Sequence, residues 1–124
     1  MRSKQLRRGL SDLAEEGVVQ LFHTAVGGHL IVGLVGLLQL EVLTSRMEAE
    51  YKIPVLFEVA PYEAARWIVS DDASALKRFM ERYRNNMAED RNNAWVFLAR
   101  NELDMKHTAE EWPEIRFLRT RERT

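Results

Sequence analysis

The first apolar positions of the chain follow a helical spacing and then change to that of a strand. Leu6, Leu10 and Leu13 recur every three or four residues among charged positions, which predicts an amphipathic helix that faces a core. Gly17 is placed to end this helix. The β-branched and aromatic residues of 18–24 then predict a strand.

A hairpin and a second helix are expected next. Gly27 and Gly28 allow the positive φ angles of a tight turn, so residues 30–35 are expected to return as a second strand. This run is apolar on both faces, which predicts a central strand covered on both sides. Gly36 then leads into a helix with no intervening loop. The apolar stripe of this helix comprises Leu37, Leu40, Leu43 or Thr44, Met47 and Tyr51.

The middle of the chain predicts two strands and a helix. Residues 53–59 and 65–69 alternate as strands do, and Pro54 belongs near the start or on the edge of the first. Asp71-Asp72 follows Ser70 and is expected to cap a third helix. The inward positions of that helix are Leu76, Phe79, Met80 and Tyr83.

The last third predicts a loop, a strand, a helix and a strand. The polar stretch 85–93 is expected to be a loop, and residues 94–99 a buried strand. A short helix is expected within 102–112, with Pro113 after it. Ile115 and Phe117 are expected to form the inward face of a final strand.

These elements predict an α+β fold in which helices pack on mixed β-sheets, in the order αββαβ followed by βαβαβ. Strands that return through helices imply at least some parallel pairing with right-handed crossovers. The order is compatible with two ferredoxin-like halves, 1–60 and 61–124, which meet near residues 60–70. A chain of 124 residues fits one domain, or two small halves that share a core.

Composition and charge exclude several classes of protein. Hydrophobic residues at 46% and charged residues at 30% are ordinary globular values, and the lack of cysteine excludes disulfides and thiolate metal sites. A cytoplasmic location suits a chain without cysteine. The net charge of −1 argues against a broad nucleic-acid-binding surface. The apolar run 30–40 is too short to span a bilayer, which takes about 20 residues, so no membrane partner is expected.

The glycines and histidines do not predict a nucleotide or metal site. Gly36 is followed by leucines where a P-loop requires lysine and serine or threonine, and the dinucleotide-binding glycine pattern does not occur. Turns and close packing explain the glycines better. His23 and His29 flank the predicted turn and could face each other, but no third ligand follows at a suitable spacing. His107 lies in a charged stretch and is expected to be solvated.

The paired acids do not predict catalysis either. Glu15-Glu16 lies at a helix end and Asp71-Asp72 at a helix start, where capping and solvation account for both. Motifs for nucleophilic catalysis do not occur. We therefore expect this chain to have no catalytic residues, to bind no cofactor and not to act as an enzyme.

Arginines concentrate at the end of the sequence, with four of them against one acid between positions 116 and 124. If Phe117 points inward, Arg116 faces outward. Arg119 and Arg121 then emerge past the end of the core. Several arginines at one end can contact phosphates with an affinity that depends on salt. The alternative is a solubilising tail, or ion pairs with neighbouring acids.

Arg66 stands beside Trp67 in a predicted strand. It is either an exposed cation that could contact RNA or a strand residue held in a salt bridge. The tryptophans are expected in the core rather than as stacking platforms for bases.

Several of these motifs together resemble the third domain of the translational GTPases, and in detail the C-terminal region of bacterial peptide chain release factor three. The signature is Gly36-x-Leu38-x-Leu40, followed by Arg46-Met47-x-x-Glu50-Tyr51. Elongation factors usually have Gly-Glu-Leu-His-Leu at the first motif. Leucine and glutamine replace the glutamate and histidine here, as in release factor three. Further similarity lies in Ala64-Ala65-Arg66-Trp67, in Asp71-Asp72 and in Phe117-Leu118-Arg119-Thr120-Arg121-Glu122.

The resemblance implies a domain of a GTPase that binds the ribosome after peptide release and promotes departure of the class-one release factor. The nucleotide motifs of such a protein do not occur here, so GTP and Mg²⁺ would belong to its GTPase domain. The chain would be a C-terminal domain of a larger cytoplasmic protein, with a boundary at Met1. Its expected partners are the ribosome and the N-terminal GTPase domains. The candidate contacts to the ribosome or its RNA are Arg66, Arg116, Arg119 and Arg121.

Two alternatives remain open at this point. One is a domain of another translational GTPase, such as an elongation-factor-like or ribosomal protection protein. The other is a free-standing metabolic enzyme or ligand-binding domain, which would need a polar concave site that the sequence does not predict.

Overall fold

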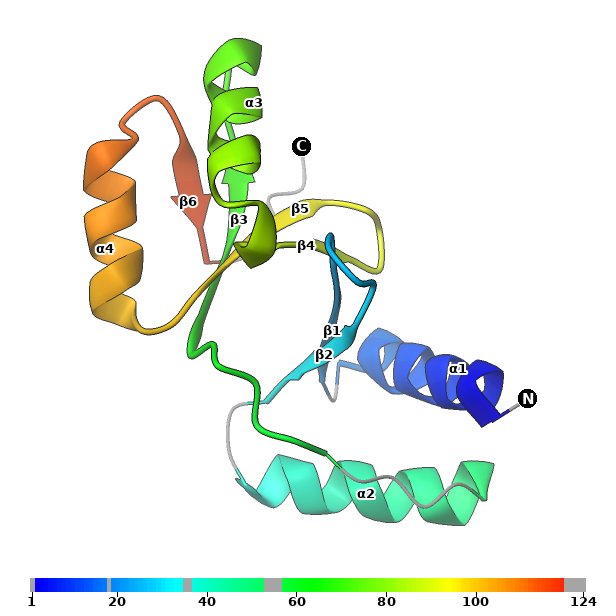
Figure 1. The fold of residues 1–124 in the computed structure, drawn as a ribbon. Coiled ribbons are helices and arrows are strands. Elements are labelled where there is room, and N and C mark those ends of the chain that lie inside the picture. Colours follow the sequence, from blue (N-terminus) through cyan, green and yellow to red (C-terminus); the bar gives the residue numbers. More distant parts are fainter. Residues whose placement is uncertain (1, 18, 35–36, 53–56, 120–124) are drawn as a thin grey trace. The chain divides into compact units, whose positions relative to one another are not determined.

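The computed structural model describes residues 2–17, 19–34, 37–52 and 57–119 (Figure 1). Contacts divide the chain into two compact units, one of residues 1–22 and 30–59 and the other of residues 23–29 and 60–124. Helices combine with antiparallel strands, so the predicted α+β fold is confirmed. The elements are α1 (Arg2–Glu15), β1 (Gln20–Thr24), β2 (Leu30–Gly33), α2 (Leu37–Tyr51), β3 (Ala64–Val69), α3 (Ala73–Arg82), the 3₁₀ helix η1 (Arg84–Asn86), β4 (Met87–Asp90), β5 (Trp95–Ala99), α4 (Glu102–Glu111) and β6 (Arg116–Leu118).

The first unit packs α1 and α2 against each other and against the hairpin strands. Leu13 on α1 and Leu43 and Met47 on α2 are completely buried, which confirms the two predicted apolar stripes at these positions. The side chain of Leu37, the first member of the second stripe, lies outside those described. The helices approach closely at Gly9, where an added Cβ would lie 2.8 Å from Met47 Sδ. Gly17 ends α1 with φ +84°, as its position predicted.

The predicted hairpin is confirmed, but its second strand is less buried than predicted. Gly27 and Gly28 have φ angles of +87° and +62°, and the Thr24 amide donates to the His29 carbonyl at 2.9 Å. Among the strands that the structure describes, β2 stands first in the order, and each of its residues is half-buried. Leu30 and Val32 pack against the core of the first unit. Ile31 and Gly33 lie on the other face of the strand and are also half-buried.

The strand predicted over residues 53–59 is not found in the part of that range that the structure describes. Residues 57–59 have no strand structure, and 53–56 lie outside the described residues. Gly36, the predicted junction, also lies outside them. The strand β2 nevertheless ends at Gly33 and α2 begins at Leu37, so a strand does give way to a helix there.

The second unit has the strand order β4-β5-β3-β6 with antiparallel pairing throughout. Trp67 on β3 pairs with Val96 on one side and Leu118 on the other. The two crossovers, β3-α3-β4 and β5-α4-β6, each skip one strand, which is the ferredoxin-like arrangement. The expected parallel pairing is wrong for these ladders, because the strands joined through a helix run parallel with another strand between them.

The predicted loop 85–93 is also wrong, because it contains η1 and β4. Only Met87 and Ala88 interrupt its polar sequence, yet they are 2% and 0% exposed. Met87 pairs with Phe97 of β5. Pairing with β5 therefore stabilises β4 as a strand even though its own residues do not predict one.

Helices α3 and α4 cover one face of this sheet and enclose an aromatic core. Phe79 of α3 is completely buried, with ring centroids of Phe97, Trp112 and Phe117 at 5.2, 5.3 and 5.6 Å. The opposite face of the sheet is also buried at Val96 and Leu98. The predicted inward positions of α3 and β5 are therefore confirmed.

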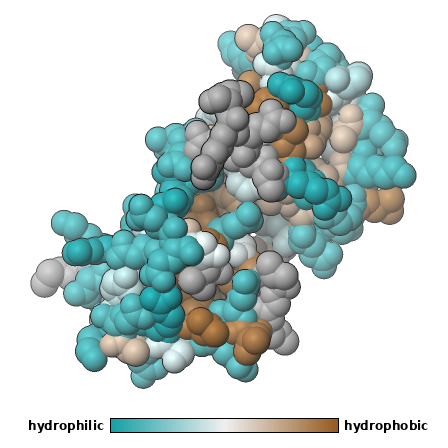
Figure 2. Space-filling model, turned by 180° about the vertical axis from the view of Figure 1, so that it is seen from behind, coloured by the Kyte–Doolittle hydropathy of each residue, from teal (hydrophilic) through white to brown (hydrophobic). Residues whose placement is uncertain are grey.

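The molecular surface in Figure 2 is largely hydrophilic, with apolar patches between polar side chains. The exposed large apolar residues among those described are Val26, Leu38, Val42, Val59 and Leu103. Within the described ranges, no helix combines the length and the hydropathy that a membrane span requires.

Candidate functional site

The terminal strand presents its arginines as the sequence predicts. Arg116 of β6 is exposed, whereas Phe117 packs against the core of the second unit. Arg119 follows β6 and is exposed as well. Arg121 lies outside the described residues. The two described arginines therefore stand on either side of a residue that anchors the strand.

Arg66 is a buried strand residue rather than an exposed cation. It is 8% exposed, and its Nη2 lies 2.6 Å from Glu102 Oε2 at the start of α4. Its Nη1 also donates to the Ala65 carbonyl at 2.8 Å. The structure thus agrees with the salt-bridge alternative for Arg66. Its guanidinium group makes its hydrogen bonds within the protein.

Glu102 brings two of the predicted arginines to one place. The hydrogen bond from Arg66 holds the pKa of Glu102 below its usual range, and the charge of Arg119 lowers this pKa further. The Glu102 carboxylate is therefore paired with Arg66 and lies within electrostatic range of Arg119.

Of the paired acids, Asp72 caps a helix as expected, whereas Glu16 forms an ion pair with Arg46 instead of being merely solvated. Asp72 caps α3 by accepting from the Ala75 amide at 3.0 Å. The Nδ1 atom of His23 is buried and has no hydrogen-bond partner among the described residues. Among the residues that the structure describes, no group of three or more histidines and acids could hold a metal ion.

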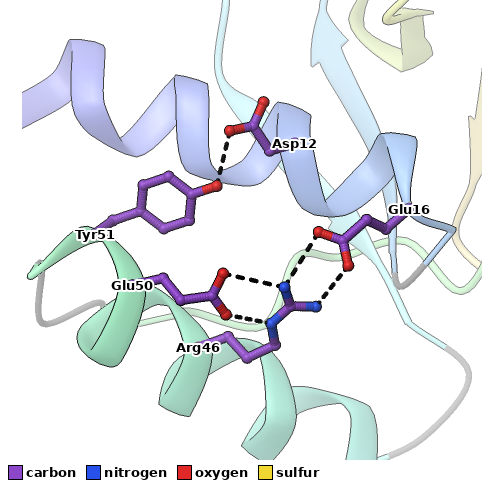
Figure 3. Close-up of polar contacts among 5 residues, drawn as sticks. All are labelled: Asp12, Glu16, Arg46, Glu50 and Tyr51. Atoms are coloured by element: carbon purple, nitrogen blue, oxygen red, sulfur yellow. Dashed lines mark hydrogen bonds and ion pairs between the residues drawn. The ribbon is translucent and has the colours of Figure 1, made fainter.

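The second signature motif forms a polar network between α1 and α2, which we call the helix clamp (Figure 3). It consists of Asp12, Glu16, Arg46, Glu50 and Tyr51. The Arg46 guanidinium donates to both oxygens of Glu16, at 2.9 and 3.1 Å, and to both oxygens of Glu50. The Tyr51 hydroxyl donates to Asp12 Oδ2 at 2.7 Å. These contacts fix α2 on α1.

Charge and hydrogen bonding in the clamp change the pKa values of its members. Hydrogen bonds to Glu50 and Glu16 raise the pKa of Arg46. The hydrogen bond from Arg46 lowers the pKa of Glu50, and the bond to Asp12 raises that of Tyr51. Sequence reasoning singled out Arg46 and Tyr51 as a motif but missed their partners on α1.

Sequence reasoning also missed an open hollow of about 410 Å³ in the second unit. Its wall includes Asp104, His107, Thr108 and Glu111, which share one face of α4. That spacing of polar residues was the available signal. His107 is exposed, as expected, but it lines this hollow.

Comparison with known protein families gives the following match. The family model described as the class II release factor RF3, C-terminal domain, matches residues 1–109. The match includes both units through most of α4 and ends before β6, so Arg116 and Arg119 lie outside it. It covers the helix clamp and Arg66. The resemblance seen in the sequence is confirmed, and the chain belongs to the family of class II release factor RF3 C-terminal domains.

Proposed function

We propose that this chain is a non-catalytic domain of a translation termination GTPase, and that it helps to release class-one release factors by contacting the ribosome. The observation that carries the proposal is the match to the RF3 C-terminal domain over residues 1–109. In this proposal GTP and Mg²⁺ bind to N-terminal GTPase domains, which are also partners of this chain. The protein acts in the cytoplasm, where the ribosomes are.

The exposed arginines supply a chemistry that suits ribosomal RNA. Arg116 and Arg119 are held on either side of Phe117, which packs into the core, so their positions are restricted. Guanidinium groups bind phosphate oxygens with two parallel hydrogen bonds. A few such contacts suffice even on a chain whose net charge is −1.

Arg66 has a different role in this proposal. Its ion pair offsets the charge of Glu102, a carboxylate that also attracts Arg119. In this proposal Arg66 weakens the hold of Glu102 on the exposed arginine and does not contact RNA itself.

Sedimentation of the 124-residue chain with ribosomes at graded salt tests the proposal. We expect the double variant R116A/R119A to bind more weakly and to reduce the slope of log affinity against log salt by about 2, since each lost phosphate contact removes about 1. The matched control is R7A/R8A, which removes two exposed arginines from α1. Equal losses in both variants, or none in either, would contradict the proposed contact.

A further inference from the structure

The hollow of the second unit has no role in the proposed ribosome contact. Its volume of about 410 Å³ lies in the range of small-ligand sites, roughly 300–1,000 Å³. Residues before β3, the end of α3, η1, β5 and one face of α4 surround it. Those that determine its chemistry are Tyr62, Tyr83, Phe97, Arg100, Asp104 and Glu111.

Aromatic rings form the apolar wall of the hollow. Phe97 is 3% exposed and meets Tyr83 edge to face, with ring centroids 5.4 Å apart. Tyr62 is half-buried, and its hydroxyl donates to the Asn85 carbonyl at 3.2 Å. The faces of such rings carry negative electrostatic potential, which attracts cations.

The charged rim of the hollow is acidic. Asp104 and Glu111 stand two turns apart on the same face of α4. Against them stands only Arg100 among the lining lysines and arginines, which leaves a formal charge of −1 with His107 neutral. Asp104 is paired with Arg100, whereas no salt bridge within the described residues holds Glu111, so this acid favours a cation over a phosphate group.

Arginines of the chain itself already contact an acid and an aromatic ring that line the hollow. Arg100 pairs with Asp104 through Nε and Nη2, each 3.0 Å from Oδ2. Arg82 lies over the Tyr83 ring, 5.6 Å from its centroid. A hydrogen bond to Tyr83 raises the pKa of Arg82, and the charge of Glu111 adds to this effect.

We propose that this hollow binds an arginine side chain of a basic protein segment. The guanidinium stacks on the aromatic wall and pairs with Glu111. Arginine fits better than lysine because its planar head both stacks on rings and pairs with a carboxylate. A protein segment fits better than RNA because the rim is acidic. The hollow shares no residue with the arginine site of the terminal strand, so either proposal can fail alone.

An NMR titration of the ¹⁵N-labelled 124-residue chain tests this site. The probes are the peptide acetyl-Ala-Arg-Ala-amide and its citrulline analogue, which has the same shape without the charge. We expect the arginine peptide to shift the amide signals of α4 and the indole signal of Trp112, whose Nε1 lies 3.4 Å from the Tyr83 hydroxyl. The citrulline peptide should bind at least about fivefold more weakly, since the ion pair and the cation–π contact are both lost.

Two variants of neighbouring acids locate the contact. Glu111→Gln should weaken the arginine peptide about two- to fivefold, as expected for one partly exposed charge pair. Glu110→Gln removes the same charge from an exposed neighbour that does not line the hollow, and it should leave binding unchanged.

Several results would overturn the proposal. These are equal binding of the citrulline peptide, equal losses in the two glutamine variants, and no shifts at about 50 mM peptide, a concentration well above the millimolar range of weak binding. Uridine 5′-monophosphate serves as a further probe. If it shifts the same signals more strongly than the arginine peptide does, the hollow is a nucleotide site instead.

Discussion

Phe79 is the residue on which the core of the second unit most depends. Its side chain is completely buried, and the ring centroids of Tyr83, Phe97, Trp112 and Phe117 lie 4.7 to 5.6 Å from its own. The residues come from two helices' ends and two strands, so this one side chain joins elements that are distant in the sequence.

Replacing Phe79 with alanine should lower the free energy of unfolding by about 3–5 kcal/mol, because a large cavity replaces a buried ring. Urea denaturation followed by circular dichroism measures the change. Lys77→Ala, at an exposed position of the same helix, is the control and should change the free energy little. A loss below about 1 kcal/mol in the Phe79 variant would show that the core closes around the gap.

Glu102 makes the stability of the fold depend on pH. Its pKa is lowered in the folded protein by Arg66, so the unfolded chain binds more protons between the folded pKa and the ordinary value of 4.5. The stabilising contribution is therefore present above pH 4.5 and is lost as the pH falls through the folded pKa. In Glu102→Gln, the decrease of the unfolding free energy between pH 6 and pH 3 should be smaller than in the parent chain. Parallel pH profiles of the two proteins would contradict this.

At the scale of elements, the sequence predicts structure correctly where the interactions join residues that are close together in the chain. The Asp72 cap, the Gly17 helix end and the stripe of α3 all follow from short-range chemistry, and the sequence predicted each of them. Strand β4 was missed because its formation depends on pairing with β5 rather than on its own residues.

The cap of α3 permits a matched pair of variants. Asp72→Ala should cost about 1 kcal/mol, because the Ala75 amide loses its acceptor. Asp71→Ala removes the same charge from the preceding exposed position and should cost less. Chemical denaturation of the two variants compares them directly, and equal costs would mean that charge, not capping, is what matters.

At the scale of the whole molecule, the fold class and most elements could be predicted, but the partners of individual side chains could not. Arg46 and Tyr51 were visible as a motif, yet Asp12 and Glu16 meet them only through the packing of α1 on α2. Arg66 was recognised as either exposed or paired, and only tertiary structure distinguishes the two. The hollow was missed for the same reason, since its rings and acids come from four separate segments.

The close contact of Gly9 with Met47 has a chemical consequence for the first unit. Oxidation adds an oxygen to the methionine sulfur and makes the side chain polar. Met47 is completely buried, and its Sδ lies where even one extra carbon on α1 would collide. A sulfoxide there would act as a wedge between the two helices. Oxidative damage at this close contact would therefore force the two helices apart.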